Sequence, residues 1–180
     1  ENIAGSAGGA IAVLQQTGNS YVTVSNSNFV NNEAANVGGA IYAASKDDAK
    51  LTVTDSYFAG NEATTGGAIY ALDDLTVYNS EFKQNTAEGG ASVYVSDKYD
   101  DIVLWVQNST FTDNNVSEAG AGILIDASND NTITYTIINS TFTDNVANGG
   151  VAPVYCAAGA AIYIEGDASV CSYGVMCAIS

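Results

Sequence analysis

The stretch Gly38–Asn61, GGAIYAASKDDAKLTVTDSYFAGN, contains two short phrases that recur along the whole chain. The first phrase is Gly-Gly-Ala-Ile, and the second reads Val-x-Asn/Asp-Ser-x-Phe-x-x-Asn. Copies of the first phrase, degraded in the last three, begin at Gly8, Gly38, Gly66, Gly89, Gly120 and Gly159. Copies of the second phrase end at Asn32, Asn61, Asn85, Asn114 and Asn145. Such recurrence indicates one structural unit repeated in space.

The spacing of the repeats indicates a solenoid. The phenylalanines of the second phrase are separated by 29, 24, 29 and 31 residues and are Phe29, Phe58, Phe82, Phe111 and Phe142. Periods of about 20–50 residues are typical of solenoids. The phrases alternate apolar and polar residues with period two, whereas helices show a 3.6-residue pattern. The sequence therefore predicts an all-β fold, a parallel β-helix with three short strands per coil and about six coils.

Alternation also predicts which side chains fill the interior. Equivalent letters of successive coils stack about 4.8 Å apart in a parallel sheet, so like side chains should form columns. The first strand contributes Ile11, Ile41, Ile69, Val93, Ile123 and Ile162. The second contributes Val22/Val24, Leu51/Val53, Leu75/Val77, Leu104/Val106 and Tyr135/Ile137, and the third contributes the five phenylalanines with Ser27, Ser56, Ser80, Ser109 and Ser140. Residues 26, 55, 79, 108 and 139 are Asn or Asp, which tolerate the left-handed conformation that a turn requires there.

The two ends of the chain differ from the repeats between them. Asn2 precedes Ile11 by nine residues, as Asn32 precedes Ile41, so residues 1–180 are expected to form one β-helix segment of a longer solenoid, beginning in mid-coil. Residues 168–180 lack Phe-x-x-Asn and are expected to form a degenerate last coil, a cap or a junction. The odd cysteine count fits one disulfide plus a thiol, or three buried small residues, and the pairings Cys171–Cys177 and Cys156–Cys171 are equally open.

The charge excludes several partners. Net charge is −16, from 20 acidic residues against four lysines, with no histidine. Such a chain repels nucleic acids and anionic membranes, and it has no apolar run long enough to enter a bilayer. Acidic residues recur in loops as Asp47-Asp48, Asp73-Asp74, Asp100-Asp101, Asp126 and Asp130. Their oxygens suit Ca²⁺, but their irregular spacing makes solvated turns the simpler interpretation, and we expect no other cofactor.

The outward positions offer contact surfaces and no catalytic residues. The first strand carries Tyr42, Tyr70, Tyr94 and Tyr163, which predict an exposed tyrosine stripe. This stripe would be an interaction face or an aromatic stack that stiffens the sheet. The second strand carries mostly threonine outward, which ordinary β-propensity explains, and Trp105 interrupts this column. Without arginine, histidine or converging carboxylates, the chain is expected not to be an enzyme.

Three N-x-S/T sequons, at Asn108, Asn115 and Asn139, are glycosylation candidates in a eukaryotic secreted context. Asn115 is expected in a loop and is therefore the most accessible of the three. Asn108 and Asn139 belong to the column of turn residues, so the repeat alone explains them.

Gly38–Ile41 with Phe58–Asn61, and Gly66–Ile69 with Phe82–Asn85, resemble the repeats of the chlamydial polymorphic outer-membrane proteins and similar extracellular proteins. The resemblance extends to about residue 165 and implies a right-handed parallel β-helix, surface display and adhesion. We therefore expect an extracellular structural or adhesive module of a cell-surface or filament protein. Its partners would be other copies, other surface proteins or glycans. The alternative is a non-catalytic or distal part of a carbohydrate-active β-helix enzyme.

Overall fold

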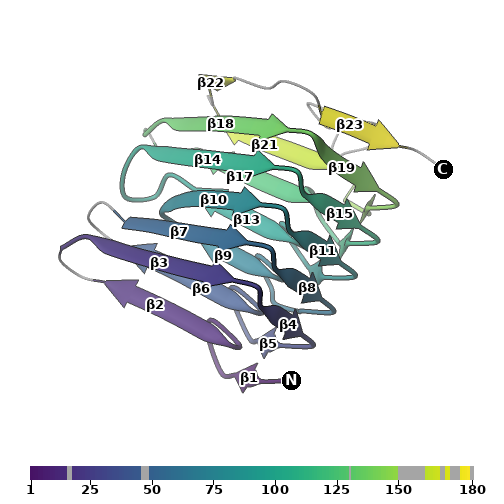
Figure 1. The fold of residues 1–180 in the computed structure, drawn as a ribbon, viewed down its shortest axis with the longest axis horizontal. Coiled ribbons are helices and arrows are strands. Elements are labelled where there is room, and N and C mark those ends of the chain that lie inside the picture. The colour runs from purple at the N-terminus through teal and green to yellow at the C-terminus, as the bar shows by residue number, and fades with distance from the viewer. Residues whose placement is uncertain are drawn as a thin grey trace.

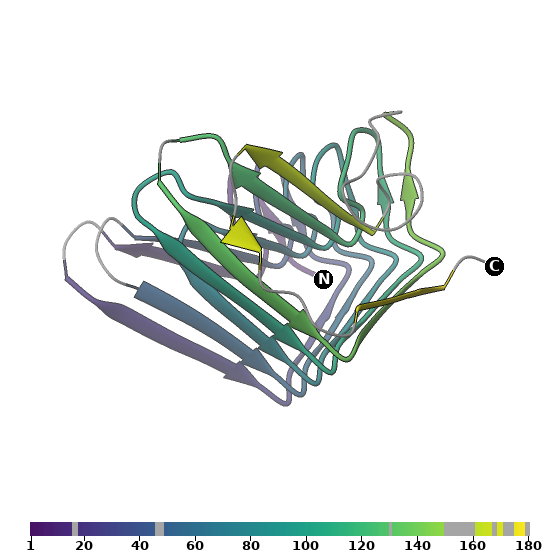
Figure 2. The same ribbon diagram turned by 90° about the horizontal axis from the view of Figure 1, so that it is seen from above.

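The computed structural model describes residues 1–15, 18–45, 49–129, 131–149, 161–166, 169–170 and 175–178. They form a parallel β-solenoid in which each strand pairs with its equivalents in the neighbouring coils (Figure 1). The chain completes about five turns, and six strands lie in each of the three long sheets. Figure 2 shows coils with a roughly three-sided outline lying over one another.

Each side of the outline is one sheet. Sheet 1 consists of β2 (Ile11–Gln15), β6 (Ile41–Ser45), β9 (Ile69–Ala71), β13 (Val93–Ser96), β17 (Ile123–Ala127) and β21 (Ile162–Gly166). Sheet 2 consists of β3 (Ser20–Ser25), β7 (Ala49–Thr54), β10 (Asp74–Tyr78), β14 (Ile102–Gln107), β18 (Ile133–Ile138) and β22 (Ser169–Val170). Sheet 3 consists of β4 (Asn28–Val30), β8 (Tyr57–Ala59), β11 (Glu81–Lys83), β15 (Thr110–Thr112), β19 (Ser140–Thr143) and β23 (Val175–Ala178).

A fourth, shorter stack follows sheet 3 in most coils and corrects the prediction of three strands per coil. It contains β1 (Ile3–Ala4), β5 (Glu33–Ala34), β12 (Thr86–Ala87), β16 (Asn115–Val116) and β20 (Val146–Ala147). Isolated bridges from Glu62 to Glu33 and to Thr86 connect its two parts. These strands have two residues each, which is too short for an alternating pattern to reveal them.

The predicted interior columns are confirmed by register and burial. Ile41, Ile69, Val93 and Ile123 are successive register partners in sheet 1, and none of them is exposed to solvent. The five phenylalanine rings form a continuous stack with centroids 4.7–4.8 Å apart and planes 4–7° from parallel. Only first-coil members of the predicted columns remain half-buried: Ile11, Val22 and Ser27. Because burial of a large apolar side chain contributes about 1.5–3 kcal/mol, stacking gives each coil a stability that it lacks alone.

Left-handed residues make the corners. The predicted Asn/Asp column has positive φ at every member, from 47° at Asn26 to 52° at Asn108. A second column, which the sequence did not reveal, precedes the asparagine of each second phrase and contains Asn31, Gly60, Gln84, Asp113 and Asp144. The third corner requires glycine, because a Cβ on Gly38 (φ 62°) would lie 2.3 Å from the carbonyl oxygen of Ile41. The Gly-Gly-Ala-Ile phrase therefore marks the tight turn that precedes a strand of sheet 1.

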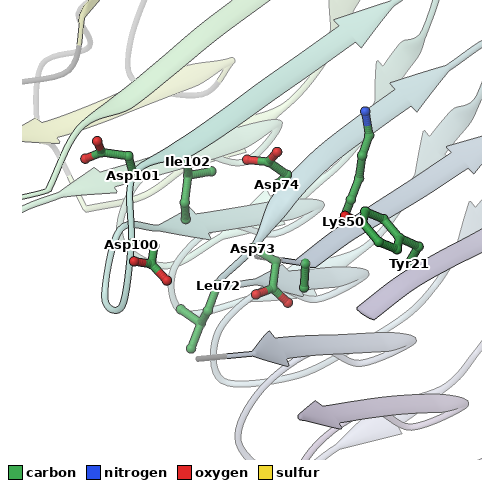
Figure 3. Close-up of a pocket in the computed structure, with 9 residues that line it drawn as sticks. Tyr21, Lys50, Leu72, Asp73, Asp74, Asp100, Asp101 and Ile102 are labelled. Carbon is green, nitrogen blue, oxygen red and sulfur yellow. The ribbon is translucent and has the colours of Figure 1, made fainter. Parts of the chain in front are cut away.

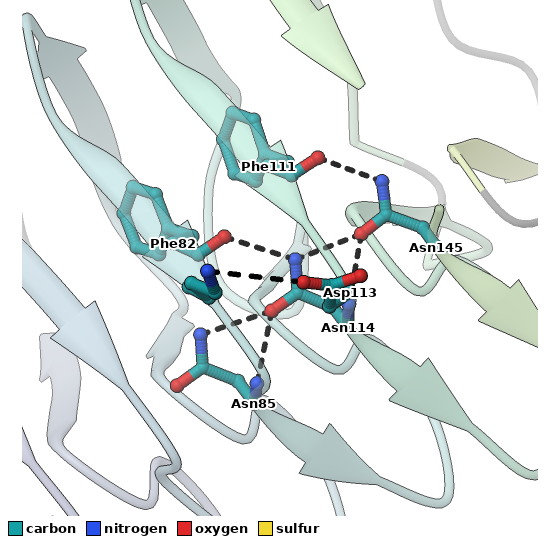
Figure 4. A network of polar contacts seen from close by, with 7 residues as sticks. Phe82, Asn85, Phe111, Asp113, Asn114 and Asn145 are labelled. Atoms are coloured by element: carbon teal, nitrogen blue, oxygen red, sulfur yellow. Dashed lines mark hydrogen bonds and ion pairs between the residues drawn. The ribbon is translucent and has the colours of Figure 1, made fainter. Parts of the chain in front are cut away.

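The asparagines that end the second phrase form a buried hydrogen-bonded ladder (Figure 4). Each Nδ2 donates to the Oδ1 of the next asparagine at 2.8–3.0 Å, through Asn2, Asn32, Asn61, Asn85, Asn114 and Asn145. From Asn61 onward, the same Nδ2 also donates to the carbonyl oxygen of the phenylalanine in the preceding coil, at 2.8–3.1 Å. The ladder therefore ties each coil to both neighbours inside the tube. Asn2 takes the first place, as its spacing from Ile11 predicts.

The last coil continues two of the sheets. Strand β22 pairs with β18, and β23 pairs with β19, so that the backbone of Cys177 is the register partner of Phe142. Cys156 and Cys171 lie outside the described residues, and nothing is described of the Cys177 side chain. The disulfide, and the role of residues 168–180 as a cap or junction, therefore stay predictions.

Candidate functional site

The predicted tyrosine stripe lies on the outer face of sheet 1 as a compact stack. The rings of Tyr42 and Tyr70 have centroids 5.6 Å apart with planes tilted by 39°, and those of Tyr70 and Tyr94 are 4.6 Å apart and stacked. Leu124 follows in the same column and is only 7% exposed, so it separates this stack from Tyr163. We call Tyr42, Tyr70 and Tyr94 the tyrosine stack.

The tyrosine stack is half-buried, whereas the sequence predicted an exposed stripe. The glycine turn explains part of the difference, because a Cβ on Gly90 would lie 3.0 Å from the Cβ of Tyr94. The side chain that follows the turn therefore packs closely over it. Tyr99, in the loop between β13 and β14, also lies near enough to raise the pKa of Tyr42 and of Tyr70.

The hydroxyls of the tyrosine stack are neutral donors at physiological pH. Burial raises the pKa of Tyr70 to about 12, with smaller contributions from Tyr42, Asp126 and Tyr99. Burial also raises the pKa of Tyr94, whose hydroxyl donates a hydrogen bond to the carboxylate of Asp126. The stack therefore presents aromatic edges and uncharged hydroxyls, which suit contact with proteins or sugars.

A separate acidic hollow lies where sheet 1 leads into sheet 2 (Figure 3). It has a volume of about 270 Å³, and the residues lining it are Tyr21, Ala49, Lys50, Leu72, Asp73, Asp74, Asp100, Asp101 and Ile102. Two of the acidic pairs that recur in the sequence, Asp73-Asp74 and Asp100-Asp101, lie together around this hollow. Asp47, Asp48 and Asp130 lie outside the described residues.

Asp73 is the buried carboxylate of the hollow, at 7% exposure. Burial raises its pKa to about 6, and the nearby Asp74 and Asp100 add to the rise. The backbone N–H of Ser45, which donates to Asp73 Oδ1 at 3.0 Å, opposes the rise without cancelling it. Asp73 therefore takes up a proton more readily than an ordinary aspartate.

Calcium finds no evident site in the described part of the chain. No group of three or more His, Cys, Asp or Glu side chains there is arranged to hold a metal ion. Nor does that part contain a helix long and apolar enough to cross a membrane.

The sequence did not single out Asp97, which organises the loops beside this hollow. Its side chain is fully buried, and its Oδ1 accepts hydrogen bonds from the N–H of Asn129 at 3.3 Å and from Asn129 Nδ2 at 3.0 Å. Its carbonyl oxygen accepts one from Asn131 Nδ2 at 2.7 Å. Asp97 thus fixes the loop of one coil against the loop of the next. Polar loop composition gave no signal for this burial.

The three sequon asparagines are all exposed. Asn108 and Asn139 occupy left-handed turn positions, as predicted. Asn115 lies in the short strand β16, so its predicted placement in a loop is wrong, and its Oδ1 accepts a hydrogen bond from Asn148 Nδ2 at 3.2 Å. Glycosylation of these residues stays a prediction.

Comparison with known proteins identifies the family and nothing narrower. The sequence matches the family described as the right-handed beta helix region over residues 2–172. Nothing in this match is specific to the chlamydial repeats. A search of curated proteins gave no match, and a search of solved structures gave none. Together with the parallel stacks of strands, the match over nearly the whole chain shows that this protein belongs to the right-handed β-helix family.

Proposed function

We propose that this chain is an extracellular structural or adhesive module of a cell-surface or filament protein. The observation that carries the proposal is the tyrosine stack, three adjoining aromatic side chains on the outside of a closely packed tube. Aromatic rings with hydroxyl tips supply contact area at a low cost in side-chain entropy. The resemblance to chlamydial surface repeats supports display outside the cell.

The construction of the tube suits a contact module. The recurring phenylalanines and asparagines stabilise the interior of the tube. The outward residues are therefore free to vary. Net charge of −16 disfavours nucleic acid and anionic membranes as partners. The partners that remain are other copies of the chain, other surface proteins and glycans.

The test uses two triple variants of the full chain. Tyr42, Tyr70 and Tyr94 are replaced together by serine, which removes the rings, or by phenylalanine, which keeps the rings and removes the hydroxyls. Beads coated with each protein are scored for aggregation with one another and for attachment to extracellular matrix. The serine variant should lose at least ten-fold in attachment while keeping the circular dichroism of the parent. Equal attachment by this variant and the parent would reject the tyrosine stack as the contact site.

A second candidate is the non-catalytic or distal part of a carbohydrate-active β-helix enzyme. The acidic hollow favours it, because carboxylate oxygens accept hydrogen bonds from sugar hydroxyls. Release of reducing sugar by the full-length protein from a panel of polysaccharides would support this candidate. Turnover that survives Asp73→Asn would place the chemistry away from the hollow, and absence of turnover would favour the contact module.

A further inference from the structure

The outer face of sheet 2 differs in charge from the chain as a whole. In its five longer strands, β3, β7, β10, β14 and β18, only Lys50 and Asp74 carry charge, and these two are register partners. The outward positions beyond this pair are uncharged: Thr23, Ser25, Thr52, Thr54, Thr76, Tyr78, Trp105, Gln107, Thr136 and Ile138. A neutral partner can therefore approach here without opposing the net charge of −16, whereas an anionic one meets repulsion.

Two aromatic side chains stand out among these uncharged positions. Trp105 is 38% exposed and Tyr78 is 40% exposed, on adjacent strands. Trp105 lies between its register partners Thr76 and Thr136, and Tyr78 is paired with Gln107. The rings are thus surrounded by hydroxyl and amide groups that can hydrogen-bond a polar ligand.

The indole of Trp105 is held in place from its own strand. Its Nε1–H donates to the Oε1 of Gln107 at 3.2 Å. This bond leans the ring toward the column that contains Tyr78 and leaves the amide nitrogen of Gln107 free to donate outward. A fixed aromatic surface binds at a smaller entropic cost than a mobile one.

The size of the face fits a narrow ligand better than a protein. Five strands about 4.8 Å apart, each up to six residues long at about 3.3 Å per residue, cover about 500 Å². A stable protein–protein interface buries about 800 Å² on each partner. Two copies meeting on this face alone would therefore form a weak complex. A polysaccharide chain needs only a line of ring platforms with hydrogen-bonding groups alongside.

We propose that the outer face of sheet 2 binds an uncharged polysaccharide, with Trp105 and Tyr78 stacking on the C–H faces of sugar rings. The neighbouring threonines and Gln107 hydrogen-bond the sugar hydroxyls. The C–H groups of a pyranose carry partial positive charge, and the face of an aromatic ring is negative, so the two attract one another. This inference rests on the proposed contact function and assigns a ligand class to a face that the tyrosine stack does not occupy.

The test is affinity electrophoresis of the full chain through gels containing a soluble neutral polymer, either xyloglucan, galactomannan or laminarin. At least one polymer should retard the parent, and 0.5 M NaCl should leave the retardation unchanged because the contact is uncharged. Trp105→Ala should weaken the association at least ten-fold, and Trp105→Phe should restore it to within about three-fold of the parent. Tyr57→Ala, which removes an aromatic side chain from sheet 3, is the matched control and should bind like the parent.

The proposal is overturned if Trp105→Ala is retarded as strongly as the parent, or if none of the three neutral polymers retards the parent. Retardation by polygalacturonate alone would also overturn it. The bead assay separates this inference from the contact function. If Trp105→Ala is retarded by the polymers as strongly as the parent while parent beads still attach, the inference fails and the contact function stands. If parent beads attach to nothing while Trp105 still determines polymer retardation, the polysaccharide site stands without an adhesive role.

Discussion

Replacing Asn114 with alanine tests whether the asparagine ladder holds the coils together. Asn114 is fully buried, and its side chain makes four hydrogen bonds to two coils. Its Nδ2 donates to the carbonyl oxygen of Phe82 at 3.1 Å and to Asn145 Oδ1 at 2.8 Å. Its Oδ1 accepts from the N–H and from the Nδ2 of Asn85, both at 3.0 Å. Alanine removes all four bonds and adds none.

The expected loss follows from the hydrogen bonds that the substitution removes. The substitution strips one hydrogen bond from each of four polar groups around the site. A typical hydrogen bond contributes about 1 kcal/mol to stability. With four bonds lost, Asn114→Ala lowers the free energy of unfolding by about 4 kcal/mol, which is large against the usual effect of one substitution.

The assay is urea unfolding followed by far-ultraviolet circular dichroism, with Asn115→Ala as the matched control. Asn115 is the next residue, has an exposed side chain and accepts one hydrogen bond, from Asn148 Nδ2 at 3.2 Å. The control should therefore stay within about 0.5 kcal/mol of the parent. If Asn114→Ala loses no more than the control, the ladder does not stabilise the fold and the reasoning from buried amides is wrong.

Three further predictions concern the phenylalanine stack, the glycine turn and the acidic hollow. Phe82→Ala should cost about 3–5 kcal/mol in urea unfolding, because its fully buried ring stacks at 4.8 Å on both sides; a cost below 1 kcal/mol would contradict this. Gly38→Ala should prevent or severely weaken folding, as seen in the melting temperature, whereas Gly5→Ala, whose Cβ meets nothing within 4 Å, should melt like the parent. Asp73→Asn should stabilise the protein at pH 8 by up to ~3 kcal/mol, because the raised pKa of about 6 makes the charged form unfavourable in the fold. This gain should shrink as pH falls through 6 toward 4, and Asp74→Asn should not reproduce it.

The interior could be predicted from the sequence because each inward-facing residue only has to fill the core. Ile41 and Phe58 recur at equivalent places, and a period of two decides which side of the strand each faces. The left-handed corner at Asp55 was predictable for the same reason, since few residue types tolerate it. These predictions needed no information beyond local pattern and the rule that equivalent letters stack.

The asparagine ladder and the burial of the tyrosine stack could not be predicted, because the repeat pattern does not specify which residues contact one another. The asparagine of the second phrase was recognised as a recurring letter, but nothing in its spacing says that Asn85 bonds to both Asn114 and the carbonyl of Phe58. The partial burial of Tyr70 depends on how closely the glycine turn approaches and on where the next loop carries Tyr99. Loop position cannot be derived from alternation, because loop residues have no register partner that fixes them.

The outer columns are informative where they depart from the repeat, and this follows from the mechanics of stacking. An inward residue that differs in size from its stacked neighbours leaves a void or a clash. Interior columns therefore stay uniform, and they indicate the fold but not the function. An outward residue meets only its two register neighbours and solvent, so it can change without loss of the tube. Trp105 stands between Thr76 and Thr136, where a third threonine would have sufficed for the sheet. A large aromatic ring at an exposed place that the fold does not require needs an explanation outside the fold, and a ligand on that face provides one.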